Sequence, residues 1–146
     1  MGFRLQIKNL YPLFYNLQPQ TCNLMTEPVI RVIAHPKDAN PDGDVFGGWI
    51  LSMMDMAGSI PARKLAKTRV VTVALDNMQF LLPVFIGDCM ECYANIEKVG
   101  TSSITVKVET FVDRVEGDTK QKVTEGRFVY VAIDKGRRKV KIPKPA

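Results

Sequence analysis

The most chemically suggestive residues of the sequence lie in the segment HPKDANPDGDVFGGWI, residues 35–50. Four of them match the first, third, fifth and sixth positions of an EF-hand calcium loop: Asp38, Asn40, Asp42 and Gly43. The twelfth position of such a loop must be a bidentate glutamate, and here it is Trp49. We therefore interpret Asp38, Asn40 and Asp42 as turn-forming residues and not as calcium ligands.

Asp44 in the same segment stands shortly before the glycine pair Gly47 and Gly48, where a helix is predicted to begin. The first N–H groups of a helix have no internal partner, and together with the helix dipole they can stabilise a developing oxyanion. A neighbouring carboxylate can deprotonate water, so the pair would suffice to hydrolyse an acyl group. The alternative is a purely structural turn and helix cap, because carboxylates are favoured at helix starts.

Other catalytic and redox motifs are missing from the sequence. His35 is the only histidine and has no evident nucleophile partner, and G-x-S-x-G, G-x-G-x-x-G and P-loop motifs are absent. Cys89 and Cys92 form one C-x-x-C without a second pair, and residues three apart in a strand face opposite sides. We expect these cysteines to pack in the core or at its edge rather than to serve a metal or redox site. With Cys22 they form an odd set, which favours a reducing cytoplasm.

The helix that would position these groups is predicted over residues 48–67. Its apolar residues recur at helical spacing and form one stripe, at Ile50, Met53, Met54, Ala57, Ile60 and Leu65. Pro61 should kink or divide this helix, because proline removes one backbone hydrogen bond and clashes with the preceding turn.

Strands are predicted on both sides of the helix. One covers residues 27–34, and four follow at residues 69–84, 88–100, 102–115 and 122–134, where the apolar period changes to two. Short turns between the last three make them antiparallel neighbours. We predict an α+β fold in which a strand, a long helix and a four-strand meander form a single sheet of about five strands with one face on the helix.

Length and charge define the domain organisation. The 146 residues suit one domain, preceded by an extension of unknown role over residues 1–24 that lacks the features of a secretory signal. Six cations near the C-terminus account for more than the net charge of +5, so the rest of the chain carries about −1. This is a basic tail rather than a basic domain, and we predict neither nucleic-acid binding nor membrane insertion. A basic-tailed, RNA-associated protein is the alternative.

A series of segments in this chain resembles the single-domain, hotdog-fold acyl-CoA thioesterases of the YciA type. The matching segments are ANPDGDVFGGWILSMMDMAG, RVVTVALDNMQF, LLPVFIGD and KVGTSS, and the resemblance covers about residues 27–143. It implies a long helix wrapped by a strongly curved antiparallel sheet, with residues 25–146 as the hotdog domain. It also implies dimers with paired sheets, usually assembled as a trimer of dimers, with active sites between subunits.

Carried over by position, the resemblance makes Asp44 the catalytic carboxylate, acting as a base on water or as a nucleophile. Gly48 would polarise the thioester carbonyl with its N–H, while Phe46 and Gly47 shape the slot around it. Further residues would bind substrate: Asn77 and Met78 in the channel, and Gly100, Ser102 and Ser103 on a hairpin that approaches the coenzyme A nucleotide. Family members often carry arginine where this chain has Thr101, so Arg69, Arg137 or Arg138 would compensate.

The function implied is hydrolysis of acyl-CoA to free coenzyme A and a carboxylic acid, in the cytoplasm, with no metal or bound cofactor. The partners implied are the acyl-CoA substrate and further copies of the chain. The alternative is a non-catalytic protein that binds acyl-CoA and leaves the thioester intact.

Overall fold

A computed structural model describes residues 27–114, 117 and 120–144. The predicted N-terminal extension and Cys22 lie outside these ranges. Within them the chain forms β1 (Ile30–Ile33), a short 3-10 helix η3 (Pro36–Asp38), α1 (Gly47–Ala66) and four long strands. These strands are β2 (Arg69–Phe80), β3 (Cys89–Val99), β4 (Ser103–Asp113) and β5 (Gln121–Ile133). The single long helix and the five strands that the sequence predicts are all present.

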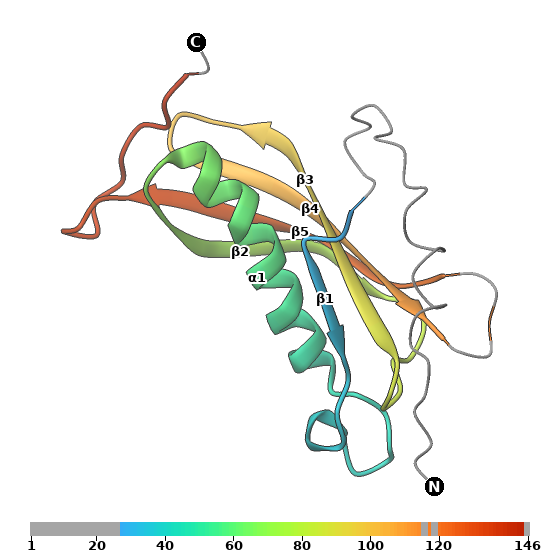
Figure 1. The fold of residues 1–146 in the computed structure, drawn as a ribbon. Coiled ribbons are helices and arrows are strands. Elements are labelled where there is room, and N and C mark those ends of the chain that lie inside the picture. The colour runs from blue at the N-terminus through green and yellow to red at the C-terminus, as the bar shows by residue number, and fades with distance from the viewer. Residues whose placement is uncertain (1–26, 115–116, 118–119, 145–146) are drawn as a thin grey trace, which may run out of the picture.

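The five strands form one antiparallel sheet in the order β1-β3-β4-β5-β2, and α1 lies across its concave face (Figure 1). β3, β4 and β5 are antiparallel neighbours, as predicted. The predicted four-strand meander is wrong, because β2 pairs with β5 and not with β3. Strands lie about 4.8 Å apart, so the connection from β2 to β3 must cross the width of two strands. β2 ends at Phe80, earlier than predicted, where the N–H groups of Leu81 and Leu82 both donate to the Val123 carbonyl, and residues 81–88 make the crossing.

The helix differs from its prediction at three points. It begins at Gly47 rather than Gly48 and ends at Ala66 rather than Lys67. Lys67 is the C-cap in the left-handed region, with φ 54°, and its N–H donates to the Arg63 carbonyl at 3.0 Å. Pro61 lies inside α1 without dividing it. The burial of the helix against the sheet on both sides of the proline stabilises the continuous helix despite the missing hydrogen bond.

The core lies between α1 and the concave face of the sheet. Met54 and Ala57 on the helix and Phe128 and Tyr130 on β5 are fully buried, and each large apolar side chain contributes about 1.5–3 kcal/mol by leaving water. A Cβ added at Gly58 would lie 2.5 Å from the Tyr130 hydroxyl, so helix and strand approach too closely there for a larger residue. Among the described residues, no helix combines the length and apolar character needed to span a bilayer.

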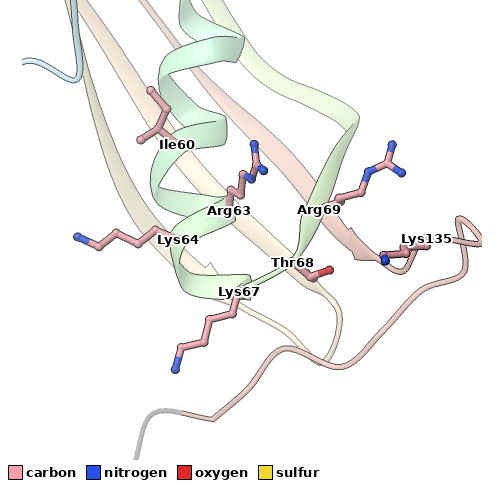
Figure 2. A pocket seen from close by; sticks show the side chains of 7 residues that line it. All are labelled: Ile60, Arg63, Lys64, Lys67, Thr68, Arg69 and Lys135. Carbon is pink, nitrogen blue, oxygen red and sulfur yellow. The ribbon is translucent and has the colours of Figure 1, made fainter.

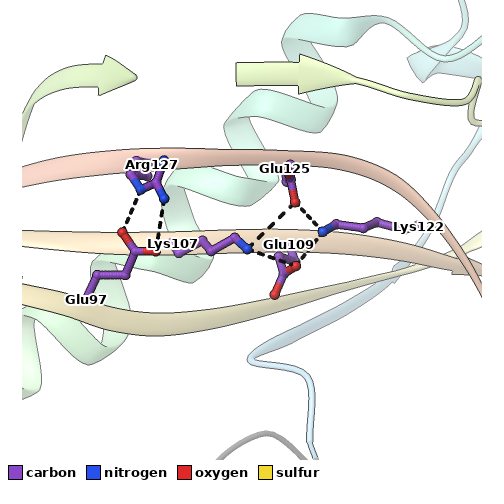
Figure 3. A network of polar contacts seen from close by, with 6 residues as sticks. All are labelled: Glu97, Lys107, Glu109, Lys122, Glu125 and Arg127. Carbon is purple, nitrogen blue, oxygen red and sulfur yellow. Dashed lines mark hydrogen bonds and ion pairs between the residues drawn. The ribbon is translucent and has the colours of Figure 1, made fainter. Parts of the chain in front are cut away.

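The opposite face of the sheet is covered by charged side chains that pair across the strands (Figure 3). Arg127 on β5 bonds Glu97 on β3 at 2.6 Å, while Lys107 and Lys122 both contact Glu109 and Glu125. Alternation along β4 explains the arrangement, because its buried residues face α1 and its lysine and glutamate face outward. The two faces are thus chemically distinct.

Glu91 on β3 is the most deeply buried carboxylate of this outer face, with 3% of its side chain exposed. Burial would raise the pKa of Glu91, but hydrogen bonds from Lys120, Tyr93 and Arg31 outweigh it and hold the pKa below its ordinary value. A carboxylate with a lowered pKa stabilises the fold above its unfolded-state value, about 4.3, and that contribution disappears as the pH falls through the folded-state pKa.

We therefore expect the free energy of unfolding to fall as the pH drops from about 5 to about 3, with Glu91 contributing to the slope. Glu91→Gln should reduce the slope in this window, as measured by urea unfolding at a series of pH values. Asp42→Asn, at an exposed turn, is the matched control and should keep the wild-type slope. An unchanged slope in Glu91→Gln would contradict the assignment.

Candidate active site

Asn40 organises the loop that presents Asp44. Its side-chain oxygen Oδ1 accepts the N–H groups of Asp42 and Asp44, both at 3.0 Å. Its own N–H donates to the Asp44 carbonyl at 2.6 Å, and Gly43 takes the left-handed conformation, with φ 93°, that closes the turn. The amide side chain therefore fixes the backbone on both sides of Asp44. This confirms Asn40 as a turn former.

Asp38 connects this loop to the start of α1. Its carboxylate Oδ2 accepts the His35 N–H at 3.0 Å, and its carbonyl accepts the Phe46 N–H at 2.9 Å. The carboxylate is buried and engaged with backbone, as expected of a structural residue rather than a calcium ligand.

The first turn of α1 leaves two backbone donors without an internal acceptor. Phe46 is the N-cap, and its carbonyl accepts the N–H groups of Trp49 and Ile50 at 3.0 and 3.2 Å. Gly47 and Gly48 precede these residues, and the Phe46 side chain makes no capping hydrogen bond. Their N–H groups are therefore available to an acceptor outside the helix.

A pocket of about 310 Å³ brings Asp44 together with the helix start and the chain that follows β2. Its walls come from the loop, from the first turn of α1 and from the end of β2 and the crossing segment: Asn40, Asp44, Val45, Gly47, Ile50, Phe80, Leu81, Leu82, Pro83 and Val84. The Phe80 ring lies against Gly47, where an added Cβ would be 3.3 Å from Cε1. A Cβ at Gly48 would meet open space, so steric crowding within one chain does not explain that glycine.

Arg114, just after β4, holds the crossing segment in place. Its guanidinium donates to both carboxylate oxygens of Asp88 at 3.1–3.2 Å and to the Pro83 carbonyl at 2.9 Å, and it lies 4.9 Å from the Phe85 ring centroid. Asp88 also accepts the Phe85 N–H at 2.9 Å. Because Phe85 forms a β-bridge with Asp44, this ion pair supports the backbone of the pocket.

The geometry suits hydrolysis of an acyl group. A half-exposed carboxylate, two backbone donors and the positive end of a 20-residue helix dipole surround one small pocket with apolar walls. Water can reach Asp44, and a carbonyl oxygen in the pocket would lie near the free N–H groups of the helix start.

Of the other predicted site residues, Phe46 lies at the helix start close to Asp44, and the rest do not come together with Asp44 in one chain. Phe46 borders the helix start with 51% of its surface exposed. Asn77 has a positive φ of 50° at a β-bulge in β2 and lines a shallow pocket on the outer face with Gln79 and Arg127. Met78 packs against the core and over Gly126, where an added Cβ would be 2.6 Å from its methyl carbon.

Arg69 and the hairpin of Gly100, Ser102 and Ser103 lie at the other end of the sheet. The Gly100 N–H donates to the Ser103 carbonyl at 2.8 Å, and Ser102 accepts the Ala132 N–H at 2.8 Å. Arg69 pairs with Ile133 at the same end of β5. Their predicted contacts with substrate therefore depend on assembly with other copies and stay predictions.

Sequence reasoning missed the apolar wall of the Asp44 pocket. The sequence predicted Phe80, Leu82 and Val84 only as the end of a strand over residues 69–84, whereas β2 ends at Phe80 and all three side chains line the pocket.

Comparison with known proteins agrees with this geometry. The profile of the Thioesterase superfamily matches residues 42–116, which include Asp44, the helix and the crossing segment. The chain belongs to this superfamily. It is 46% identical over 111 residues to the acyl-CoA thioester hydrolase YciA of Salmonella typhimurium, covering 74% of this chain and 84% of that protein.

Solved structures of other thioesterases share the fold. A hexameric hotdog fold thioesterase of Campylobacter jejuni superimposes with a TM-score of 0.77 at 42% identity, over 81% of this chain and 91% of that one. A hexameric thioesterase of Yersinia pestis gives a TM-score of 0.78 at 45% identity, over 82% and 97%. The fold of this superfamily member is the hotdog fold that the sequence resemblance implied.

Two further predictions concern cysteines and metals. Cys89 and Cys92 are free thiols on β3, and the buried Cys92 contacts the Thr110 hydroxyl at 3.6 Å, which confirms a packing role. Across residues 27–114, 117 and 120–144, no three metal-ligating side chains come together. The predicted independence from metals and cofactors stays a prediction.

Arg114→Ala should destabilise the fold of this thioesterase by about 1–3 kcal/mol, because it leaves the Asp88 carboxylate, 7% exposed, without its cation. Urea unfolding measures the change. Arg127→Ala removes a more exposed pair with Glu97 and should therefore cost less stability than Arg114→Ala. Equal losses of stability in the two variants would show that the buried Asp88 pair stabilises the fold no more than the exposed Glu97 pair does.

Proposed function

We propose that this protein hydrolyses acyl-CoA thioesters to free coenzyme A and a carboxylic acid. The observation that carries the proposal is Asp44 in one pocket with the uncapped helix start of Gly47 and Gly48. The thioesterase superfamily match and relatives named as acyl-CoA thioester hydrolases support the same activity and substrate class.

In the proposed reaction, the Asp44 carboxylate removes a proton from water while the oxygen attacks the thioester carbonyl. The oxyanion of the tetrahedral intermediate accepts the Gly48 N–H, and the dipole of α1 stabilises its charge. Collapse of the intermediate breaks the carbon–sulfur bond, and the proton held by Asp44 passes to the departing coenzyme A thiolate. Direct attack by Asp44 would instead form an anhydride, which water then hydrolyses to the same products.

The chain supplies every group of this proposed reaction, so neither a metal nor a bound cofactor is required. Phe46 and Gly47 would border the thioester, and the apolar crossing segment would contact the acyl chain. Asn77 and Met78 would line the channel, while Gly100, Ser102 and Ser103 would reach the nucleotide from a neighbouring copy. The free thiols of Cys89 and Cys92 suit a reducing compartment such as the cytoplasm.

We also propose that copies assemble through the free edge of β2, as a dimer within a hexamer. β2 is a 12-residue edge strand, and large apolar side chains along and after it are exposed, including Val73, Leu75 and Phe80 at 45–55%. An apolar, unpaired edge of this length is suited to pairing with a second sheet. The related thioesterases of Campylobacter jejuni and Yersinia pestis are hexameric.

Asp44→Ala should lower turnover by roughly 10²- to 10⁴-fold, because the general base is removed. Release of free thiol from a panel of acyl-CoAs measures the rate, and circular dichroism with a melting curve establishes that the variant is folded. Asp42→Ala, an exposed carboxylate in the same turn, is the control and should keep wild-type turnover. A folded Asp44→Ala protein with full activity would refute the mechanism. Binding of acyl-CoA by the wild type without release of thiol would refute the proposed hydrolase activity.

Replacing Val73 and Leu75 by lysine should weaken assembly, because the two lysines at the β2 edge of one copy would repel the same lysines of the other copy across the interface. Sedimentation velocity over a range of concentrations should show smaller species than the wild type. Ile96→Lys, at an exposed apolar position on β3, on the other side of the sheet from β2, is the control. Wild-type sedimentation of the Val73→Lys/Leu75→Lys protein would exclude this edge as the interface.

A further inference from the structure

The two ends of α1 border hollows of different character. At the C-terminal end, a hollow of about 620 Å³ is lined mainly by cations, among them Arg63 and Arg69 (Figure 2). At the start of the helix, the smaller Asp44 pocket has apolar walls and borders the core, since Ile50 and Val84 line it and are buried. The second hollow suits an acyl chain, so the residues behind its walls can select among acyl groups.

A row of small polar side chains crosses the concave face of the sheet and ends at this pocket. Cys92 on β3 pairs with Thr110 on β4, Thr110 pairs with Thr124 on β5, and Thr124 pairs with Phe80 on β2. Residues paired in this way project from the same face of the sheet, with their Cβ atoms about 4.5–5.5 Å apart. The first three residues have no exposed surface, whereas Phe80 reaches the surface and lines the Asp44 pocket.

The Thr124 hydroxyl has no hydrogen-bond partner inside the protein. In the part of the chain that the structure describes, its Oγ1 is the one buried side-chain oxygen or nitrogen without a partner, whereas the neighbouring Thr110 hydroxyl contacts Cys92 Sγ at 3.6 Å. Burial of an unpaired hydroxyl destabilises a fold. Valine has the same branched shape without this cost, and the fully buried Val108 and Val123 occupy the same two strands. A ligand that completes the hydrogen bonding of Thr124 would explain the hydroxyl.

Phe80 separates Thr124 from the Asp44 pocket. Phe80 lines that pocket and Thr124 does not, and the Phe80 ring lies against Gly47, where an added Cβ would be 3.3 Å from Cε1. The ring therefore lies between the start of α1 and the row of polar side chains. Because Phe80 is the last residue of β2 and 54% of it is exposed, its side chain can change rotamer without disturbing the core.

We propose that Phe80 is a movable end wall of the acyl pocket, and that the Thr124 hydroxyl behind it binds a neutral polar group at the far end of a short acyl chain. This inference rests on the proposed function and names a class of acyl group that the Asp44 site accepts. The chain takes the place of the Phe80 ring between Gly47 and Thr124, and its terminal hydroxyl forms a hydrogen bond with Oγ1. A terminal carboxylate does not fit, because the row supplies no cation to balance its charge.

The test compares two acyl-CoAs of equal length. 4-Hydroxybutyryl-CoA ends in a hydroxyl group where pentanoyl-CoA ends in a methyl group. Thr124→Val should lower kcat/KM for 4-hydroxybutyryl-CoA roughly two- to tenfold, the contribution of one hydrogen bond, and should leave kcat/KM for pentanoyl-CoA at or above the wild-type value. Thr110→Val removes a hydroxyl that already has a partner and is the control, in which the ratio of the two kcat/KM values should stay unchanged.

Stability distinguishes this role from a purely structural one. Because the Thr124 hydroxyl has no partner in the protein, Thr124→Val should unfold at the same urea concentration as the wild type or at a higher one. A clearly lower midpoint would show that the hydroxyl is satisfied within the protein, and it would overturn the inference.

Phe80→Leu tests the movable wall. A shorter side chain should open the way to Thr124, so the preference for 4-hydroxybutyryl-CoA over pentanoyl-CoA should rise above that of the wild type. The rise should be lost in Phe80→Leu/Thr124→Val, because the hydroxyl is then missing. An unchanged preference in Phe80→Leu would contradict the role of Phe80 as the wall.

The substrate pair also separates this inference from the proposed function. An unchanged ratio of the two kcat/KM values in Thr124→Val would overturn the inference and leave the hydrolase activity intact. Failure of the wild type to release thiol from either acyl-CoA would instead overturn the proposed function, so the two failures are distinguishable.

Discussion

The structure depends on the burial of one helix against one face of a five-stranded sheet. Met54 and Ala57 lie in the core with no exposed surface, and Gly58 allows the helix to approach β5 so closely that the Tyr130 hydroxyl donates to the Asp55 carbonyl at 2.7 Å. This burial stabilises a continuous α1 even though Pro61 lacks a backbone donor. Because the helix is fixed along its length, both of its ends become defined positions: backbone donors at one end and a cluster of cations at the other.

The strand order explains how a pocket forms at the start of α1. Since β2 and β3 lie on opposite sides of the β4–β5 pair, the chain between them must cross that pair, and it does so beside the start of α1. That passage brings the Val84 carbonyl within 2.9 Å of the Val45 N–H and places apolar residues beside Asp44. Arg114 then fixes the passage through Asp88. The apolar wall of the pocket thus depends on the order of the strands, whereas the position of the Asp44 carboxylate depends on its local loop.

Local patterns in the sequence predicted the elements well and their neighbours less well. The period of apolar residues predicted one helix and five strands, and Asp44, Gly47 and Gly48 could be grouped because they are close in sequence. Periodicity carries no information on strand order, so the pairing of β2 with β5 was not predicted. Phe80 and Arg114 reach the site only through tertiary structure. Asn77 and Met78 were assigned to a substrate channel by resemblance, a role that one chain alone does not test.

The exposed edge of β2 has a consequence for how the protein is made in the cell. A newly synthesised chain that has folded but not yet met a partner carries an unpaired, apolar strand, which is the type of surface that seeds aggregation. Folding and assembly are then in kinetic competition with misassociation, and the stability of each copy depends on protein concentration. Pairing of this edge would therefore remove an aggregation-prone surface at the same time as it forms the oligomer.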